Sequence, residues 1–318
     1  MELTQGNTRT TIGALVAAWA LAACGGAPAS TSGAGATALP NAPAASSVPA
    51  GLPAGWSTKA IEAANTRLQS CAQANTLQPS GCPQRTSRFE SSTVEAAHWT
   101  LRNGPLAHAV AVPVTQLAGI APSPGQVEVY GRYQMDVSYT VSGQSIRPFR
   151  DYSGGIAHAT MSWDGHSFQN VQFDLAWSRP RSEVVLAVFA RPNEVSDAVA
   201  LAAVKTGFED CVTLPPPLSN SASIPNCPQN HVYYVVAGVT VARWVLTNDP
   251  MQGALVSFNT EGGYFAVTGN FSMNLNYHIT VPNNPQQAAN GDHTGQAAGT
   301  YTATLVWDGH QLNLLNIR

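Results

Sequence analysis

The sequence predicts an α+β fold built from two tandem repeats, each with one N-terminal helix packed on a curved antiparallel sheet of four or five strands. Three observations support this expectation. Short motifs recur in the same order in both halves of the chain, a helical pattern opens each half, and strand patterns with a period of two follow it. The 318 residues are 44% apolar, which is enough to bury a core.

The first observation is an ordered series of matches between the two halves. A Cys-Pro-Gln motif occurs twice, and a tryptophan follows each of these cysteines at a spacing of 17 residues. A long strand-like segment and a Trp-Asp-Gly-His motif then recur in the same order. The matched pairs are 82–84 with 227–229, Trp99 with Trp244, 129–139 with 267–277, and 163–166 with 307–310. We infer a tandem duplication, because chance matches would not keep this order.

The chain is expected to divide into five parts. They are a lipoprotein signal peptide at 1–23, a flexible Ala/Gly/Pro/Ser tether at 24–55, the first repeat at 56–176, a connecting segment at 177–190, and the second repeat at 191–318. The tether cannot bury enough apolar area to offset its chain entropy, so we expect it to stay extended and flexible. A short apolar run in the connecting segment would complete the first sheet or pack at the junction of the repeats.

A helix is expected at the start of each repeat. Residues 58–71 and 195–211 are rich in helix-forming residues, and their apolar side chains recur at helical spacing on one face. The expected face consists of Ile61, Ala64 and Leu68 in the first helix and of Val199, Ala203 and Phe208 in the second. Each helix would cover the concave, apolar face of its sheet.

The remainder of each repeat reads as antiparallel strands. Every odd position of 127–141 is apolar or glycine, and nearly every even position is polar; the segment 265–281 repeats this alternation. Alternation over so many residues predicts a sheet with one buried face and one solvated face.

The two Trp-Asp-Gly-His motifs are expected to form hairpin turns. Asp-Gly stands between strand patterns at 156–163 and 167–173, and again between 300–307 and 311–317. This dipeptide is typical of a type I′ turn, in which both central residues have positive φ. Turn geometry therefore accounts for Asp164 and Asp308 without catalysis.

The layout of one helix followed by four or five antiparallel strands resembles the cystatin-like or NTF2-like superfold. Repeats with a Cys-Pro pair, a mid-unit Trp and a Trp-Asp-Gly hairpin also resemble extracytoplasmic modules of actinobacterial envelope proteins that have no assigned role. Because this fold hosts enzymes, carriers and scaffolds alike, the resemblance implies little about function.

The N-terminus is interpreted as an export signal. An apolar run from Ile12 to Ala23 is too short to span a bilayer and suits the core of a secretory signal. It ends in Leu21-Ala22-Ala23-Cys24, which resembles the lipobox of bacterial lipoproteins. The resemblance implies that Cys24 carries an acyl lipid such as palmitate, becomes the first residue after cleavage, and anchors the protein to a bacterial membrane on its extracytoplasmic side.

The other four cysteines are expected to form disulfides, because an exported chain meets an oxidising compartment. Three pairings are possible. The duplication favours Cys71 with Cys82 and Cys211 with Cys227, one bridge in each repeat. The alternative is a metal site, but two distant pairs without a CxxC spacing do not fit zinc ligands.

Composition and motifs give little sign of an active site. Fifteen Lys and Arg against 18 Asp and Glu leave no basic excess for binding nucleic acid. The sequence contains no GxSxG, HExxH, Walker or GxGxxG motif in a suitable context, so no cofactor is expected. His166 and His310 recur in both repeats, each after a hairpin turn, but neither has a second metal ligand nearby in sequence.

A possible ligand-binding face lies on the even positions of the first repeat. Tyr130, Arg132, Arg147 and Arg150 lie on or near this face, and the second repeat has no such cluster. If one repeat binds an anionic ligand, this is the candidate surface. The alternative is an ordinary solvated face of a sheet.

Three functions remain open. The first is a non-enzymatic, lipid-anchored envelope protein whose repeats bind a partner protein or act as a scaffold. The second is a carrier of a small apolar or lipidic ligand in the cavity between helix and sheet. The third is an NTF2-like hydrolase or isomerase, which would need a polar pair in that cavity, whereas the inward positions are apolar.

Overall fold

The structure is a computed structural model of the whole chain. It describes residues 51–86, 94–102, 104, 106–114, 124–142, 144–174, 184–216, 222–232, 238–280 and 290–318. Residues 47–318 belong to one compact unit. The expected signal peptide, Cys24, most of the expected tether and the first part of the connecting segment lie outside the described residues.

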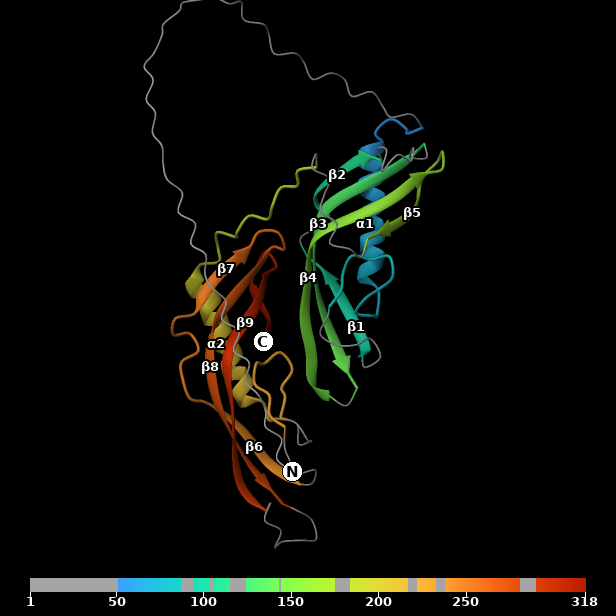
Figure 1. The fold of residues 1–318 in the computed structure, drawn as a ribbon. Helices are drawn as coiled ribbons and strands as arrows, with labels where there is room; N and C mark the ends of the chain where they lie inside the picture. Colours follow the sequence, from blue (N-terminus) through green and yellow to red (C-terminus); the bar gives the residue numbers. More distant parts are fainter. Residues whose placement is uncertain are drawn as a thin grey trace, which may run out of the picture. The chain divides into compact units, whose positions relative to one another are not determined.

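The first module, formed from the first repeat, consists of one helix and a five-stranded antiparallel sheet (Figure 1). Its elements are α1 (Trp56–Ala72), β1 (Val94–Leu101), β2 (Ala107–Pro113), β3 (Gln126–Val141), β4 (Gln144–Trp163) and β5 (Phe168–Phe173). The strand order is β1-β3-β4-β5. Strand β2 pairs with the first half of β3, and β1 pairs with the second half.

The second module has the same topology. Its elements are α2 (Asp197–Thr213), β6 (Val239–Leu246), β7 (Leu255–Asn259), β8 (Tyr264–Ile279), β9 (Gly291–Trp307) and β10 (Leu312–Ile317). The sheet order is β6-β8-β9-β10, and β7 pairs with β8. Strands β6 to β10 therefore occupy the same positions in the second sheet as β1 to β5 occupy in the first. This confirms the expected α+β fold of two modules.

Each helix packs its apolar face on its own sheet. Ala60, Ala64 and Leu68 of α1 are fully buried, as are Ala200, Val204 and Phe208 of α2. The inward side chains of β3 and β8 are buried in the same way, with Val129 and Met135 at 0% exposure in β3. Side chains of helix and sheet therefore pack against each other in the interior of each module.

The predicted buried face of the second helix was wrong by one position. Val199 is 44% exposed, and Ala200 is buried in its place. The physical reason is the disulfide at Cys211. This cysteine must face inward, and at 100° per residue the positions on its side of the helix include Ala200 and Val204 rather than Val199.

The two Asp-Gly hairpins are present, but the predicted turn type was wrong. Gly165 has φ +103° and Gly309 has φ +97°, whereas neither Asp164 nor Asp308 has a positive φ. A type I′ turn with Asp and Gly at its centre would need a positive φ at both residues, so neither hairpin has it. Each aspartate precedes the turn and accepts hydrogen bonds from two following backbone N–H groups through Oδ1. These bonds hold the pKa of Asp308 at about 2.

The outer face of β3 differs from the expected solvated face. In β8 the even positions are exposed or half-buried, in keeping with the alternation in the sequence. In β3 the stretch 130–134 is buried on both faces. The connecting segment accounts for part of this burial: Val184 and Leu186 pack on Tyr130, so the segment lies at the junction rather than completing the sheet.

No helix within the described residues is long and apolar enough to cross a membrane.

Candidate functional site

Both expected disulfides are present in the structure. Cys71 bonds to Cys82 and Cys211 bonds to Cys227, with Cα–Cα distances of 5.6 and 5.7 Å. Each bridge joins the last turn of the helix to the loop that follows it. Disulfides of this kind persist in oxidising compartments, which fits an extracytoplasmic protein.

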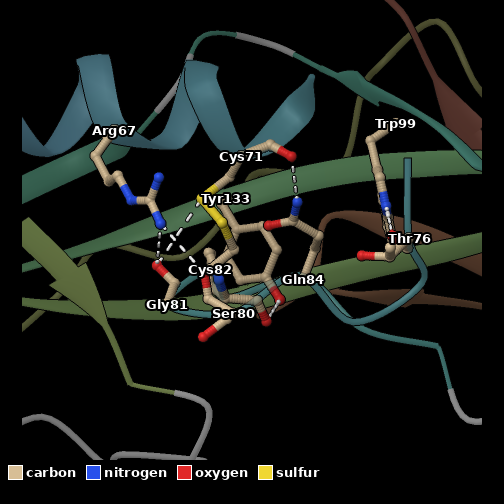
Figure 2. The surroundings of a disulfide bond; sticks show 10 residues. Arg67, Cys71, Thr76, Ser80, Gly81, Cys82, Gln84, Trp99 and Tyr133 are labelled. Carbon is tan, nitrogen blue, oxygen red and sulfur yellow. Dashed lines mark hydrogen bonds between the residues drawn. A yellow bond between two sulfur atoms is a disulfide. The ribbon is translucent and has the colours of Figure 1, made fainter. Parts of the chain in front are cut away.

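The glutamine of each Cys-Pro-Gln motif has a role that the sequence did not reveal. Figure 2 shows Gln84 beside the first disulfide, where its Nε2 donates to the carbonyl oxygen of Cys71 at 2.6 Å. Gln229 makes the equivalent bond to Cys211 at 2.9 Å. Carbonyl groups at the end of a helix lack partners within the helix, so each motif closes its helix with a covalent bond and a hydrogen bond together.

The interior of the first module contains a pair of hydroxyl groups. Tyr133 Oη lies 2.9 Å from Ser153 Oγ and donates to the carbonyl oxygen of Pro83 at 3.0 Å. Burial raises the pKa of Tyr133. The pair ties β3 and β4 to the disulfide loop shown in Figure 2.

Arg132 and Gln134, on the outer face of β3, connect the two modules. Arg132 donates to the carbonyl oxygen of Ala187 at 2.7 Å and to that of Glu261 at 2.9 Å. Gln134 donates to the carbonyl oxygens of Gly262 and Gly263 at 3.2 and 2.7 Å. Both side chains are buried, at 4% and 2% exposure. The β7–β8 turn of the second module therefore closes over β3.

Tyr152 of β4 adds to the same contact. Its hydroxyl donates to the carbonyl oxygen of Gly262, and its ring lies 5.1 Å from the ring of Tyr264. Burial raises the pKa of Tyr152. The turn is thus bonded by three side chains of the first module, all of which reach backbone carbonyls rather than side chains.

A glycine is required in this turn. Gly263 has φ +75°, and a Cβ there would lie 2.1 Å from Nε2 of Gln134 and 2.8 Å from the ring of Phe189. Gly253 has a similar φ of +71°, but its Cβ would meet nothing within 4 Å. An alanine at Gly253 would therefore suffer backbone strain alone, whereas an alanine at Gly263 would suffer both backbone strain and steric clashes.

We expect Gly263→Ala to lower the free energy of unfolding by more than Gly253→Ala does. The left-handed backbone costs about 1–2 kcal/mol for a residue with a Cβ, and only Gly263→Ala also displaces the buried Gln134. Urea unfolding followed by tryptophan fluorescence measures both variants. Equal losses would contradict the tight closure of the turn over Gln134.

The start of β4 is a second contact between the modules. Strand β5 pairs only with residues 159–163 of β4, which leaves the earlier part of that edge without a partner strand in the described residues. Asn226 covers it: its Nδ2 donates to Pro148 O at 3.0 Å, and its Oδ1 accepts from Arg150 N at 2.7 Å. Asn316 Nδ2 donates to Arg150 O at 3.1 Å. Covered edges of this kind do not recruit foreign strands.

An ion pair strengthens this second contact. Arg318 of the second module pairs with Asp151 of β4. The other oxygen of Asp151 accepts a 2.5 Å bond from the hydroxyl of Thr86. Asp151 is buried, so both of its oxygens need partners. The first module supplies Thr86 and the backbone N–H of Tyr152, which donates to Oδ1 at 2.7 Å, and the second module supplies Arg318.

Arg147 reaches the second disulfide. Its Nε donates to Pro225 O at 2.9 Å, and its Nη2 lies 2.9 Å from Cys227 Sγ. Burial lowers the pKa of Arg147; Asp210 opposes this shift, and Arg150 adds to it. The two guanidinium groups are therefore close enough to repel each other.

A cavity of about 520 Å³ opens beside these two arginines. Its walls come from the start of β4, from the second half of α2 and from β10. The lining includes Arg147, Arg150, Asp210, Leu312 and Leu314. It combines two cationic groups, one carboxylate and an apolar wall, and so it can hold a small molecule with a polar end and an apolar end.

A separate cluster surrounds His158 on the outer face of β4. The ring of His158 stacks on Tyr130 with a centroid distance of 4.4 Å. His158 Nδ1 lies 2.9 Å from Asp174 Oδ2, and Tyr130 Oη donates to Glu128 Oε2 at 2.9 Å. Val184 and Leu186 pack on Tyr130, so the cluster lies under the connecting segment. Among the described residues no group of three or more His, Cys, Asp or Glu could hold a metal ion.

The four residues of the expected ligand face thus divide among three places. Tyr130 lies in the His158 cluster, Arg132 binds the β7–β8 turn, and Arg147 and Arg150 line the cavity. The sequence pointed to these four residues because the second repeat has no equivalent group of tyrosine and arginine side chains. Gln134 was missed because an amide on a polar strand face looks like a solvated residue, and the carbonyl groups that it binds carry no signal in the sequence.

No family model matches the chain, and no curated protein is similar to it in sequence. One solved structure with a weak similarity is described as an "Ntf2 like protein involved in plasmid conjugation". The match covers 70% of this chain and 78% of that one, at 10% sequence identity and a TM-score of 0.17. The description of the fold therefore rests on the strand order alone.

Proposed function

We propose that this protein is a non-enzymatic binding protein of the bacterial cell envelope, anchored by a lipid on Cys24. The observation that carries the proposal is the cavity at the junction of the modules, together with the bonds that fix its walls. The cavity brings charged and apolar side chains of both modules together, which suits the binding of a ligand.

The two disulfides support the extracytoplasmic part of the proposal. Both are buried and each closes a helix, and bonds of this kind form and persist in oxidising compartments. The lipobox-like Leu-Ala-Ala-Cys at 21–24 supports the anchor, and the Ala/Gly/Pro/Ser composition of 24–55 supports a tether between anchor and body.

The packed interiors favour a site at the junction over a carrier cavity between helix and sheet. Ala60, Ala64 and Leu68 of α1 and Val129 and Met135 of β3 are fully buried, and the hydroxyl of Tyr133 is already bonded. A lipidic ligand in that position would have to displace side chains of the core.

The anchor is tested by Cys24→Ala in the producing cells. We expect the protein to move from the membrane fraction to the soluble extracytoplasmic fraction, because a lipid chain supplies most of the affinity for the bilayer. Ser30→Ala, within the expected tether, is the matched control and should stay with the membrane. Unchanged membrane partitioning of Cys24→Ala would refute the anchor.

The binding role is tested by native mass spectrometry of the protein isolated from its own membranes. A reproducible mass above that of the lipidated chain is the expected result, and its disappearance after unfolding shows that the ligand is not covalent. A bare mass from every preparation would count against a small ligand and in favour of a protein partner or a scaffold.

A further inference from the structure

We propose that the cavity between α2, β10 and the start of β4 binds a small organic anion, with one carboxylate or phosphate group at Arg147 and Arg150 and an apolar body against Leu312 and Leu314. This inference rests on the proposed binding function and adds to it the chemical class of the ligand. It depends on the charges and surfaces that the two modules bring together.

The charges in the cavity favour an anion. Arg147 and Arg150 bring two positive charges, and Asp210 supplies one negative charge within range of Arg147. Among the described residues, neither arginine forms an ion pair within 4 Å, and the guanidinium of Arg150 has no hydrogen-bond partner. One positive charge is therefore left uncompensated, and an oxyanion between the two guanidinium groups would relieve their repulsion.

The position of Arg147 is fixed before any ligand arrives. Its Nε and Nη2 are bonded to Pro225 O and Cys227 Sγ, so one edge of its guanidinium group is occupied. The Nη1 group is left to donate to a ligand. A preorganised donor loses little side-chain entropy on binding.

The opposite wall selects an apolar group. Leu314 lies directly over Gly207 of α2, where a Cβ would meet its Cδ2 at 2.2 Å. Leu312 and Leu314 are only half-buried, although both are large apolar side chains. A cavity of about 520 Å³ is within the range of small-molecule sites, so it has room for an aromatic or short aliphatic body beside the anionic group.

The test uses three probes of similar size: phenylacetate, phenyl phosphate and neutral phenylacetamide. Titration calorimetry on the disulfide-bonded protein should show binding of the two anions and at least tenfold weaker binding of the amide. Higher salt should weaken binding of the anions, because a half-exposed charge pair is screened. Shifts of the amide resonances of Gly207 and Asn226 locate the site.

Substitutions separate the site from general charge effects. We expect Arg150→Gln to weaken phenylacetate binding about tenfold, in line with the loss of one charge-assisted hydrogen bond. Arg243→Gln removes an exposed arginine of β6 outside the cavity and should leave binding unchanged. Asp210→Asn removes the competing carboxylate and should tighten binding.

Equal binding of phenylacetate and phenylacetamide, or equal effects of Arg150→Gln and Arg243→Gln, would overturn the inference. The outcome is distinguishable from failure of the proposed function. If native mass spectrometry shows a bound ligand while the anionic probes do not bind, the ligand class alone is wrong. If the probes bind while Cys24→Ala stays with the membrane, the anchor alone is wrong.

Discussion

Replacing Cys211 and Cys227 together with serine should lower the free energy of unfolding by about 2–5 kcal/mol, the usual range for a native disulfide in a small domain. The bridge closes a loop with a sequence separation of 16 residues. Its loss also places two hydroxyl groups in a buried site beside Arg147, which then loses its contact with sulfur. Urea unfolding of the double variant, followed by tryptophan fluorescence, measures the change.

The matched control is the double replacement of Cys71 and Cys82. Its loop has a separation of 11 residues, so chain entropy alone makes the two losses equal to within about 0.3 kcal/mol. A clearly larger loss for the second bridge would report its additional role at the junction, through Arg147. A loss below about 1 kcal/mol for both variants would contradict the stabilising role that the structure assigns to the bridges.

Arg132→Met should lower the free energy of unfolding by about 2–4 kcal/mol, because the two hydrogen bonds that its charged, buried side chain donates are lost at about 1–3 kcal/mol each. These carbonyls belong to Ala187 and Glu261, so the variant loosens the connecting segment and the second module from β3. Differential scanning calorimetry should show one cooperative transition for the native protein and separate transitions for the two modules of the variant.

The control for Arg132→Met is Asn270→Met. In the aligned repeats Asn270 takes the place of Arg132, and it is exposed on β8. A substitution on an exposed strand face changes stability by no more than about 0.5 kcal/mol. If both variants behave alike, the bonds of Arg132 do not hold the modules together.

The fold could be predicted because its signals are local or repeated. Alternating apolar residues in 127–141 and 265–281 place β3 and β8 to within two residues at their described ends, and the repeated Cys-Pro-Gln motif favours the disulfide pairs over the other pairings. These features depend on periodicity and on the equivalence of two copies, both of which a sequence displays directly.

The contact between the modules could not be predicted, because the groups that accept its hydrogen bonds are backbone carbonyls. Arg132 belongs to the cluster that distinguishes the first repeat, whereas Gln134 looked like a solvated residue. The acceptors of Arg132, Gln134 and Tyr152 are carbonyl groups of the turn around Gly262. Every residue carries a carbonyl group, so only the tertiary arrangement shows which ones are used. What the sequence can show is a strand face that carries long hydrogen-bond-donating side chains in one repeat and short ones in the other.

Smaller errors arose where a tertiary constraint decided between neighbouring positions. The inward direction of Cys211 shifted the buried face of α2 from Val199 to Ala200. The hydrogen bonds of Asp164 and Asp308 placed these residues before the turn rather than within it.

The use of backbone acceptors at the junction has a consequence for divergence. Almost any residue can replace Glu261 without removing the carbonyl that Arg132 binds, whereas few residues can replace Arg132. In related chains we therefore expect positions 132, 134 and 152 to vary little and position 261 to vary freely. The two modules would remain attached while the second one drifts in sequence, so that one copy preserves the assembly and the other is free to acquire new surfaces.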